Sequence, residues 1–158
     1  MPFLDDIVPG ETRNLGAYTF TPEAIVAFAQ RFDPQPFHLD AEAAARSHFG
    51  GLVASGWHTA VIWMKLLVRD LTQAARTSLA RGERPARVGS SPGFRDLKWL
   101  KPVYAGDTIS YRTTATDKRV TGSQPGWGLL FHENSGVNQH GEEVFRFSGS
   151  VFWERRAA

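Results

Sequence analysis

The feature that most constrains this chain of 158 residues is a long, mostly apolar helix predicted from Gly56 to about Thr77. Apolar residues recur there at helical spacing, and others widen the apolar face until only a narrow polar stripe remains. The apolar positions are Trp57, Ala60, Val61, Met64, Leu67, Val68, Leu71 and Ala75, widened by Ile62, Trp63 and Leu66. Such a helix needs cover over most of its circumference, so we expect the rest of the chain to wrap around it.

Several other stretches have the composition of β-strands and are separated by Gly and Pro. They are Thr12 to Thr19, Gly93 to Leu100, Thr108 to Thr116, Trp127 to Asn138 and Glu143 to Trp153. In the last of them, large apolar residues alternate with Arg146, Ser148 and Ser150, which is typical of an antiparallel sheet with one buried face. One long helix and these strands predict an α+β fold, in a single domain over residues 1–158.

A shorter helix is predicted before the long one, and it should end at Asp33. Pro34 disfavours the helical conformation in the residue before it, and a second proline stiffens the next step. We therefore expect Asp33 to His38 to form a constrained loop. Asp40 is then placed to cap a short, Ala-rich helix that reaches about Ser47.

The composition argues against several classes of protein. The formal net charge is only +2, with 18 Lys and Arg scattered among 16 Asp and Glu, so we do not expect a nucleic-acid partner. Without cysteine, neither disulfides nor thiolate chemistry is available. Lys65, Arg69 and Asp70 interrupt the main apolar run, which argues against a membrane span, and the first residues do not resemble a secretory signal. We expect a cytoplasmic protein.

The stiffened loop carries a carboxylate, Asp33, and an imidazole, His38, five residues apart. Addition of water to a double bond requires a base that activates the water and an acid or orienting group beside it. Asp and His can share these roles. Taken alone, however, the same two residues could instead cap a helix end and pack within a loop.

The segment from Phe28 to Asp40, continued to Ala54-Ser55-Gly56-Trp57-His58, resembles the hydratase motif of the MaoC-like dehydratases and R-specific enoyl-CoA hydratases. A second stretch, Phe94 to Thr108, is similar to the strand, turn and strand of these domains, and is shared with other hot-dog proteins. The resemblance implies a hot-dog fold, an antiparallel sheet wrapped around the long central helix. It also implies that Asp33 and His38 are catalytic, and that the Gly56 N–H supports a thioester carbonyl.

Gly56 has an independent physical reason for this role. The first turn of a helix has unpaired N–H groups and the positive end of the helix dipole. Donors aimed at a thioester oxygen stabilise enolate-like charge more in the transition state than in the ground state. Glycine also admits a ligand closely, although the turn into the helix could itself require a glycine. We expect Ser55 to be the N-cap, and Ser55 and Trp57 to be substrate-binding neighbours, with core packing as the alternative for Trp57.

The resemblance thus implies an enzyme, a carbon–oxygen lyase of fatty acid metabolism that hydrates enoyl thioesters or dehydrates 3-hydroxyacyl thioesters. Coenzyme A or an acyl carrier would hold the substrate, and no metal or other cofactor is needed because the thioester is itself the electron sink. Met64 stands where some R-specific hydratases have a serine, so the acyl-chain preference is not predicted. An exposed sheet edge predicts a homodimer or a dimer of dimers, with each active site near the interface.

Three alternatives remain open at this point. A hot-dog acyl-CoA thioesterase would also use a carboxylate and an oxyanion donor. His38-Leu39-Asp40 has the His-x-Asp spacing of a non-haem iron site, which His132 or His140 could complete. A non-catalytic subunit that binds acyl thioesters would keep the fold without turnover.

Overall fold

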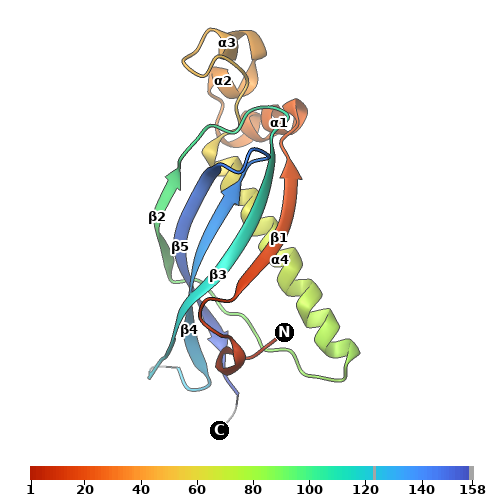
Figure 1. Cartoon of the computed structure of the whole chain (residues 1–158), viewed down its shortest axis with the longest axis vertical. Coiled ribbons are helices and arrows are strands. Elements are labelled where there is room, and N and C mark those ends of the chain that lie inside the picture. The colour runs from red at the N-terminus through yellow and green to blue at the C-terminus, as the bar shows by residue number, and fades with distance from the viewer. Residues whose placement is uncertain (123, 157–158) are drawn as a thin grey trace.

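The computed structural model describes residues 1–122 and 124–156, in which a five-stranded antiparallel sheet curves around one long helix (Figure 1). The strands are β1 (Thr12–Thr19), β2 (Gly93–Trp99), β3 (Thr108–Val120), β4 (Trp127–Val137) and β5 (Glu143–Glu154), preceded by the 3-10 turn η1 (Leu4–Asp6). Their order in the sheet is β1-β3-β4-β5-β2, and all neighbours are antiparallel. This is the predicted hot-dog architecture of the α+β class.

The strands lie where the sequence predicts them, with one clear extension. β3 continues to Val120, past the predicted end at Thr116. A register shift between Ala115 and Asp117 allows it to keep pairing with β4 beyond that point. Such a bulge bends a strand without ending it, so the polar residues after Thr116 still belong to the ladder.

The central helix α4 (Gly56–Ala80) begins at the predicted residue and ends slightly beyond the predicted Thr77. The Ser55 hydroxyl accepts a hydrogen bond from the Trp57 N–H at 3.2 Å, which confirms Ser55 as the N-cap. No glycine or proline interrupts the helix after its first residue, and Gly82, with φ +75°, follows its end. None of the helices in the described part of the chain combines the length and hydropathy needed to cross a membrane.

The main core lies between α4 and the concave face of the sheet. Ile62, Trp63 and Leu66 of α4 are almost completely buried there. They belong to a cluster with Leu15, Phe20, Ile25, Ala54, Val103, Ile109, Tyr111, Val144 and Phe145. Each such apolar side chain contributes about 1.5–3 kcal/mol when it is fully buried, so this cluster positions α4 and its first turn firmly against the sheet.

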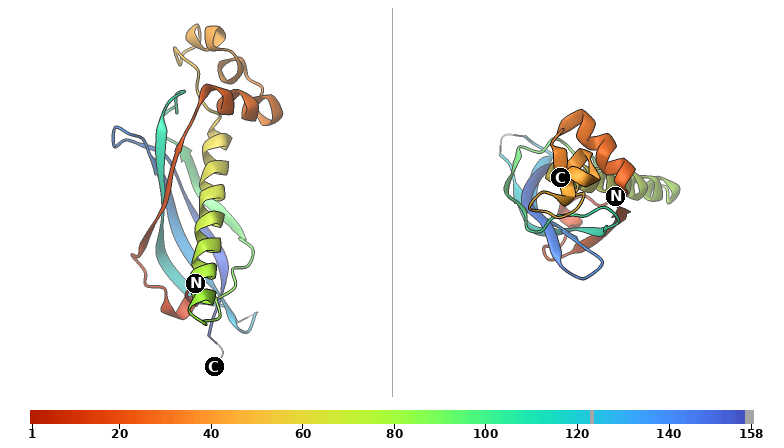
Figure 2. Two further views of the ribbon diagram at one scale, coloured as in Figure 1. Left: turned by 90° about the vertical axis from the view of Figure 1, so that its right-hand side faces the viewer. Right: turned by 90° about the horizontal axis from the view of Figure 1, so that it is seen from above.

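The sheet covers only one face of α4, so the expectation that most of its circumference is buried was wrong for the single chain. Figure 2 shows the helix along one side of the curved sheet, with no other element over its outer side. Trp57, Val61, Met64 and Val68, which we call the α4 stripe, are 50 to 53% exposed. Their spacing of three or four residues places them on one helix face. The apolar surface of this helix therefore exceeds what five strands can cover.

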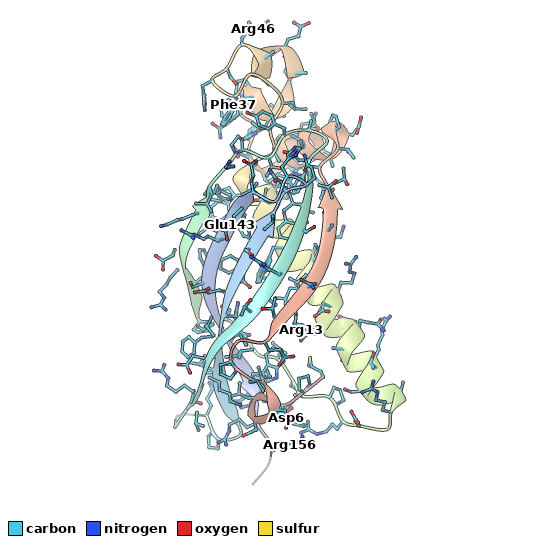
Figure 3. The ribbon with its side chains drawn as sticks, in the orientation of Figure 1. Asp6, Arg13, Phe37, Arg46, Glu143 and Arg156 are labelled. Atoms are coloured by element: carbon cyan, nitrogen blue, oxygen red, sulfur yellow. The ribbon has the colours of Figure 1, made fainter. Side chains whose placement is uncertain are left out.

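Three short helices precede α4 and form one end of the molecule: α1 (Pro22–Phe32), α2 (Pro36–Leu39) and α3 (Ala41–Ala45). In Figure 3, Phe37 and Arg46 mark this end, and Asp6 and Arg156 mark the opposite one. α1 ends immediately before Asp33, as the following proline predicts. This end brings the loop that carries Asp33 and His38 to the start of α4.

The expected loop from Asp33 to His38 is only partly a loop. It becomes helical at Pro36, so His38 lies within the single turn of α2. The fixed φ of proline suits the first turn of a helix as well as it suits a loop, and here it starts one. Asp40 caps α3 as predicted, accepting a hydrogen bond from the Ala43 N–H at 2.6 Å, but α3 ends at Ala45, before the predicted Ser47.

Candidate active site

Asp33 connects the end of α1 to the start of α4. Its Oδ2 accepts a hydrogen bond from the Ser55 hydroxyl at 2.6 Å, and its Oδ1 accepts one from the Gln35 side-chain amide at 2.8 Å. Ser55 thus acts at two places, since the same hydroxyl caps α4. The carboxylate is held at both oxygens, beside the first turn of the central helix.

The environment of Asp33 favours its charged form. Burial raises the pKa of the carboxyl, but the hydrogen bonds from Ser55 and Gln35 and the nearby His38 outweigh this effect and bring the pKa below its ordinary value of 3.8. Asp33 is therefore an anion at neutral pH. It can accept hydrogen bonds and a proton without first losing one.

His38 is buried, at 5% exposure, and its ring orientation is defined by the backbone. Its Nδ1 lies 2.7 Å from the Val53 carbonyl oxygen, and because a carbonyl only accepts, Nδ1 carries the hydrogen. Val53 is itself held by a bridge to Tyr104 and by a hydrogen bond from its N–H to the Phe37 carbonyl. In the neutral ring, Nε2 then presents a lone pair.

That lone pair faces the Asp33 carboxylate, with Nε2 3.4 Å from Oδ2. The structure therefore brings together the two predicted catalytic residues. With the His38 ring in its neutral form, both groups are acceptors. Two acceptors at this distance do not satisfy each other. A water that donates one hydrogen to each would satisfy both, and would turn its oxygen lone pairs outward.

Gly56 begins α4 next to these residues, and its N–H has no hydrogen-bond partner in residues 1–122 and 124–156. The structure gives a different reason for the glycine than close approach of a ligand. A Cβ at this position would lie 2.5 to 2.7 Å from the Trp99 indole, whose Nε1 donates to the Gly56 carbonyl at 2.8 Å. Trp99 of β2 thus occupies the side where close approach of a ligand was expected.

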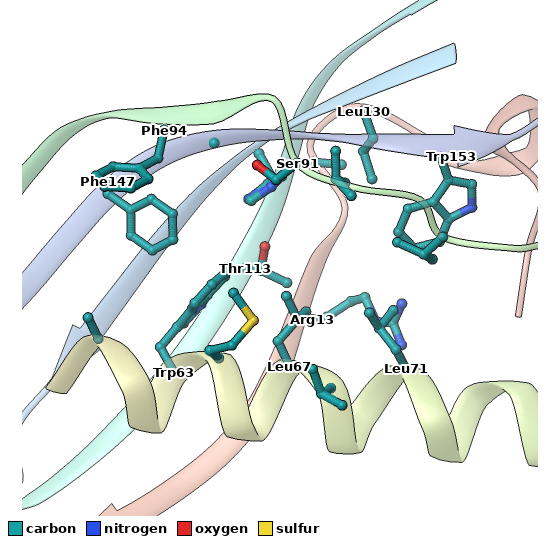
Figure 4. A pocket seen from close by; sticks show the side chains of 18 of the residues that line it. Arg13, Trp63, Leu67, Leu71, Ser91, Phe94, Thr113, Leu130, Phe147 and Trp153 are labelled. Atoms are coloured by element: carbon teal, nitrogen blue, oxygen red, sulfur yellow. The ribbon is translucent and has the colours of Figure 1, made fainter. Parts of the chain in front are cut away.

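Trp57, which follows Gly56 in the chain, lines a cavity of about 400 Å³ between α4 and the sheet (Figure 4). It packs edge-on against Trp99, with ring centroids 5.2 Å apart. Phe94 and Phe147 lie toward the start of α4, and Trp153 lies toward its end. The lining is predominantly aliphatic and aromatic. The alternation in β5 predicted a buried face here, but no sequence signal showed that space would remain between that face and the helix.

The remaining histidines do not join the site. His58 is buried and stacks on Phe28 with centroids 4.5 Å apart, and burial lowers its pKa to about 4, so it packs in the core. The Asp40 carboxylate is used as a helix cap. Within the described residues, no three His, Asp or Glu side chains gather closely enough to hold a metal ion, so neither His132 nor His140 completes a site with His38 and Asp40.

The chain is similar to several known proteins over most or all of its length. Residues 6–126 match the family model described as the MaoC like domain. The crystal structure of a MaoC-like dehydratase from Rhodospirillum rubrum is 37% identical, with all of both chains covered and a TM-score of 0.83. The uncharacterized protein YdeM of Bacillus subtilis is 27% identical over 96% of this chain and 99% of its own. An (R)-hydratase from A. caviae, 19% identical over 92% of this chain and 96% of that one, has the same fold with a TM-score of 0.65. The chain therefore belongs to the MaoC-like dehydratase family.

Proposed function

We propose that this protein adds water to the double bond of an enoyl thioester, or removes it from a 3-hydroxyacyl thioester. The observation that carries the proposal is the 3.4 Å distance between Asp33 Oδ2 and His38 Nε2, beside the first turn of α4. The family and the (R)-hydratase activity of the relative from A. caviae support the same reaction class.

In this mechanism, one water donates its two hydrogens to Asp33 and His38 and presents its oxygen to the β-carbon of the substrate. Asp33, the main base, takes a proton as the hydroxide adds, and the electrons of the double bond move toward the thioester carbonyl. The Gly56 N–H and the positive end of α4 stabilise the resulting enolate oxygen. The proton then passes to the α-carbon, so that the elements of one water are added.

The cavity next to Trp57 is the proposed site of the acyl chain. Its volume of about 400 Å³ is within the range of small-molecule pockets, roughly 300–1,000 Å³. Its apolar lining would stabilise each buried methylene by about 0.8 kcal/mol. Coenzyme A or an acyl carrier would remain outside as the carrier of the substrate, and the reaction needs no metal or other cofactor since the thioester accepts the electrons.

The experiment is a screen of trans-2-enoyl-CoA substrates, in which loss of the conjugated double bond and release of free thiol are measured separately. Asp33→Asn and His38→Ala should each reduce kcat/KM for hydration by about a hundredfold or more. Asp40→Asn is the matched control, because it changes a carboxylate of the same segment that only caps α3. It should keep near-parental turnover.

Other results would overturn the proposal. Near-parental hydration by folded Asp33→Asn or His38→Ala would remove the two residues from the mechanism. Release of free thiol with the double bond intact would indicate a thioesterase. Binding of enoyl-CoA without turnover, over the whole screen, would indicate a non-catalytic subunit.

A further inference from the structure

The cavity between α4 and the sheet contains an imidazole that the proposed chemistry does not use. His132 lies on β4 and lines the cavity between two aromatic side chains. Its ring is nearly parallel to that of Trp63, with centroids 6.2 Å apart, and edge-on to that of Phe147 at 6.4 Å. Gly149, its cross-strand neighbour on β5, makes room for the ring, since a Cβ there would lie 2.7 Å from His132 Cε1.

Asn134 determines which ring nitrogen of His132 carries the hydrogen. Its side-chain Nδ2 lies 2.8 Å from His132 Nδ1 and donates to the Phe147 carbonyl at 3.3 Å. Asn134 Oδ1 also lies near His132 Nδ1, at 3.1 Å, but the contact with Nδ2 is shorter, and the Phe147 carbonyl identifies Nδ2 as a donor. We therefore assign His132 Nδ1 as the acceptor, so that the neutral ring carries its hydrogen on Nε2. Asn134 is only 2% exposed and so holds the ring firmly. Burial lowers the pKa of His132, which keeps the ring neutral at neutral pH.

The Nε2–H of His132 is free to bind a ligand. It has no hydrogen-bond partner in the described part of the chain, and it is not sealed by neighbouring atoms as the Trp63 indole nitrogen is. Arg13, Ser91 and Thr113 also line the cavity, but Arg13 is paired with Asp70 and the Ser91 hydroxyl donates to the Ser150 carbonyl. The His132 Nε2–H is a ring-fixed donor, and a wholly apolar ligand would bury it without a partner.

The distance of His132 from Gly56 along the cavity can be estimated from the rise of α4. Its stacking partner Trp63 lies seven residues after Gly56, which is about 10 Å along an α-helix. A substrate with its thioester oxygen at the Gly56 N–H and its chain along α4 would pass His132 at about that distance. The two donors would then contact the same substrate at its two ends.

We propose that the His132 Nε2–H binds an oxygen in the distal part of the acyl chain, so that the preferred substrates carry a ketone, hydroxyl or ether roughly 10 Å from the thioester carbonyl. This inference rests on the proposed function. It assigns to His132, Asn134 and Gly149 the selection of an oxygenated chain over a plain alkyl chain of the same length.

The test compares three substrates: trans-2-dodecenoyl-CoA, the same thioester with a ketone at the ninth carbon, and the four-carbon crotonyl-CoA, which is too short to reach His132. Wild-type protein should prefer the keto chain over the alkyl chain by about tenfold or more in kcat/KM, because only the keto chain satisfies the buried donor. His132→Leu should abolish this preference and leave crotonyl-CoA hydration within about twofold. His132→Gln, which keeps an N–H donor, should retain part of the preference.

The matched control is His140→Leu, which removes an exposed imidazole from the turn between β4 and β5 and should change none of the three rates. If wild-type protein hydrates none of the three thioesters, the proposed function itself fails. If it hydrates them but does not prefer the keto chain, the role of His132 is wrong, whether or not the leucine variant folds. A preference that persists in folded His132→Leu leads to the same conclusion.

Discussion

Asp33 is an anion because particular side chains surround it, and removal of one of them should be visible in the pH dependence of the reaction. The hydrogen bond from Ser55 is the first of the effects that lower its pKa, and burial opposes them. In Ser55→Ala, burial remains while this hydrogen bond is lost, so the pKa of Asp33 should rise. Because the carboxylate is active above its pKa, the acid limb of kcat/KM should move to higher pH, as measured from acid to neutral conditions.

Ser55→Ala also removes the N-cap of α4, which should lower the free energy of unfolding by about 1 kcal/mol. A control must therefore show that loss of a helix cap alone does not move the acid limb. Thr21→Ala is the matched control. It removes the N-cap of α1, where the Thr21 hydroxyl accepts from the Ala24 N–H, without a contact to Asp33. Its acid limb should stay at the parental position. An unmoved limb in Ser55→Ala would mean that Asp33 is not the group that titrates.

The glycine at the start of α4 can be tested only together with Trp99, because a methyl group on Gly56 collides with that indole. Gly56→Ala in the wild-type background should lower the free energy of unfolding by about 1–3 kcal/mol, through overpacking. In a Trp99→Ala background the same substitution should cost little, so the double-mutant cycle should be strongly non-additive. Additive losses, measured by chemical denaturation, would show that Trp99 is not the reason for the glycine.

The same Trp99→Ala background isolates the oxyanion donor. There, Gly56→Pro removes the N–H that faces the proposed enolate, and Gly56→Ala keeps it with the collision relieved. Proline is tolerated in a first helical turn, so folding should survive in both. The proline variant should lose roughly ten- to a thousandfold more kcat/KM than the alanine variant. Equal losses would leave Gly56 with a packing role alone.

At the scale of elements, a carboxylate ties the end of the sheet to the segment that follows α4. Glu154 at the end of β5 is 7% exposed, and accepts hydrogen bonds from the Arg84 side chain and from the backbone and side chain of Arg87. Burial raises its pKa, but these hydrogen bonds outweigh burial and bring the pKa to about 2. Glu154→Gln should therefore lower the free energy of unfolding at neutral pH by about 1–3 kcal/mol.

The lowered pKa of Glu154 also predicts how this loss of stability depends on pH. The pKa of Glu154 is lower in the folded state than its ordinary value of 4.5, so its stabilisation is present above pH 4.5 and is lost as the pH falls toward about 2. The difference in free energy of unfolding between wild type and Glu154→Gln, measured by denaturation, should therefore decrease over that pH interval. Glu142→Gln, in an exposed pair with Lys101, should differ little from wild type at any pH. A difference for Glu154→Gln that is constant with pH would refute the assignment.

The whole molecule has an apolar surface that a single chain leaves uncovered. The α4 stripe is half-exposed, and three of its residues, Trp57, Met64 and Val68, also line the cavity. Trp57 touches Trp99 of β2, an edge strand of the sheet. Exposed apolar patches and open strand edges favour association. We therefore expect a homodimer or a dimer of dimers, in which a second chain covers the stripe and the edge close to Gly56.

Light scattering at assay concentration measures this directly. Val61→Glu places a charge in the middle of the stripe and should shift the protein toward a less active monomer. Val120→Glu is the matched control, since Val120 is also exposed but lies on β3, away from α4. Its oligomeric state should be unchanged. A wild-type protein that is a stable, active monomer would contradict the prediction.

Several structural features of this protein can be predicted from the sequence because the residues that cause them lie close together in the chain. A proline ends α1 before Asp33, Ser55 caps α4, and the alternation in β5 produces a sheet with one buried face. Each depends on residues a few positions apart, so a short window of sequence contains the whole cause. The pattern of Asp33 and His38 alone left their roles open, and only its resemblance to the motif of the family made them a candidate dyad.

Only the tertiary structure decided which surfaces meet. Periodicity showed that α4 is apolar on most sides, but not that five strands would cover one side and leave the α4 stripe exposed. Trp99 lies against Gly56 and His132 lies against Trp63, although each pair is far apart in sequence. Such contacts depend on how the strands curve and on the space that remains between the sheet and the helix. No short stretch of the chain contains that information, because it arises only when the whole core packs.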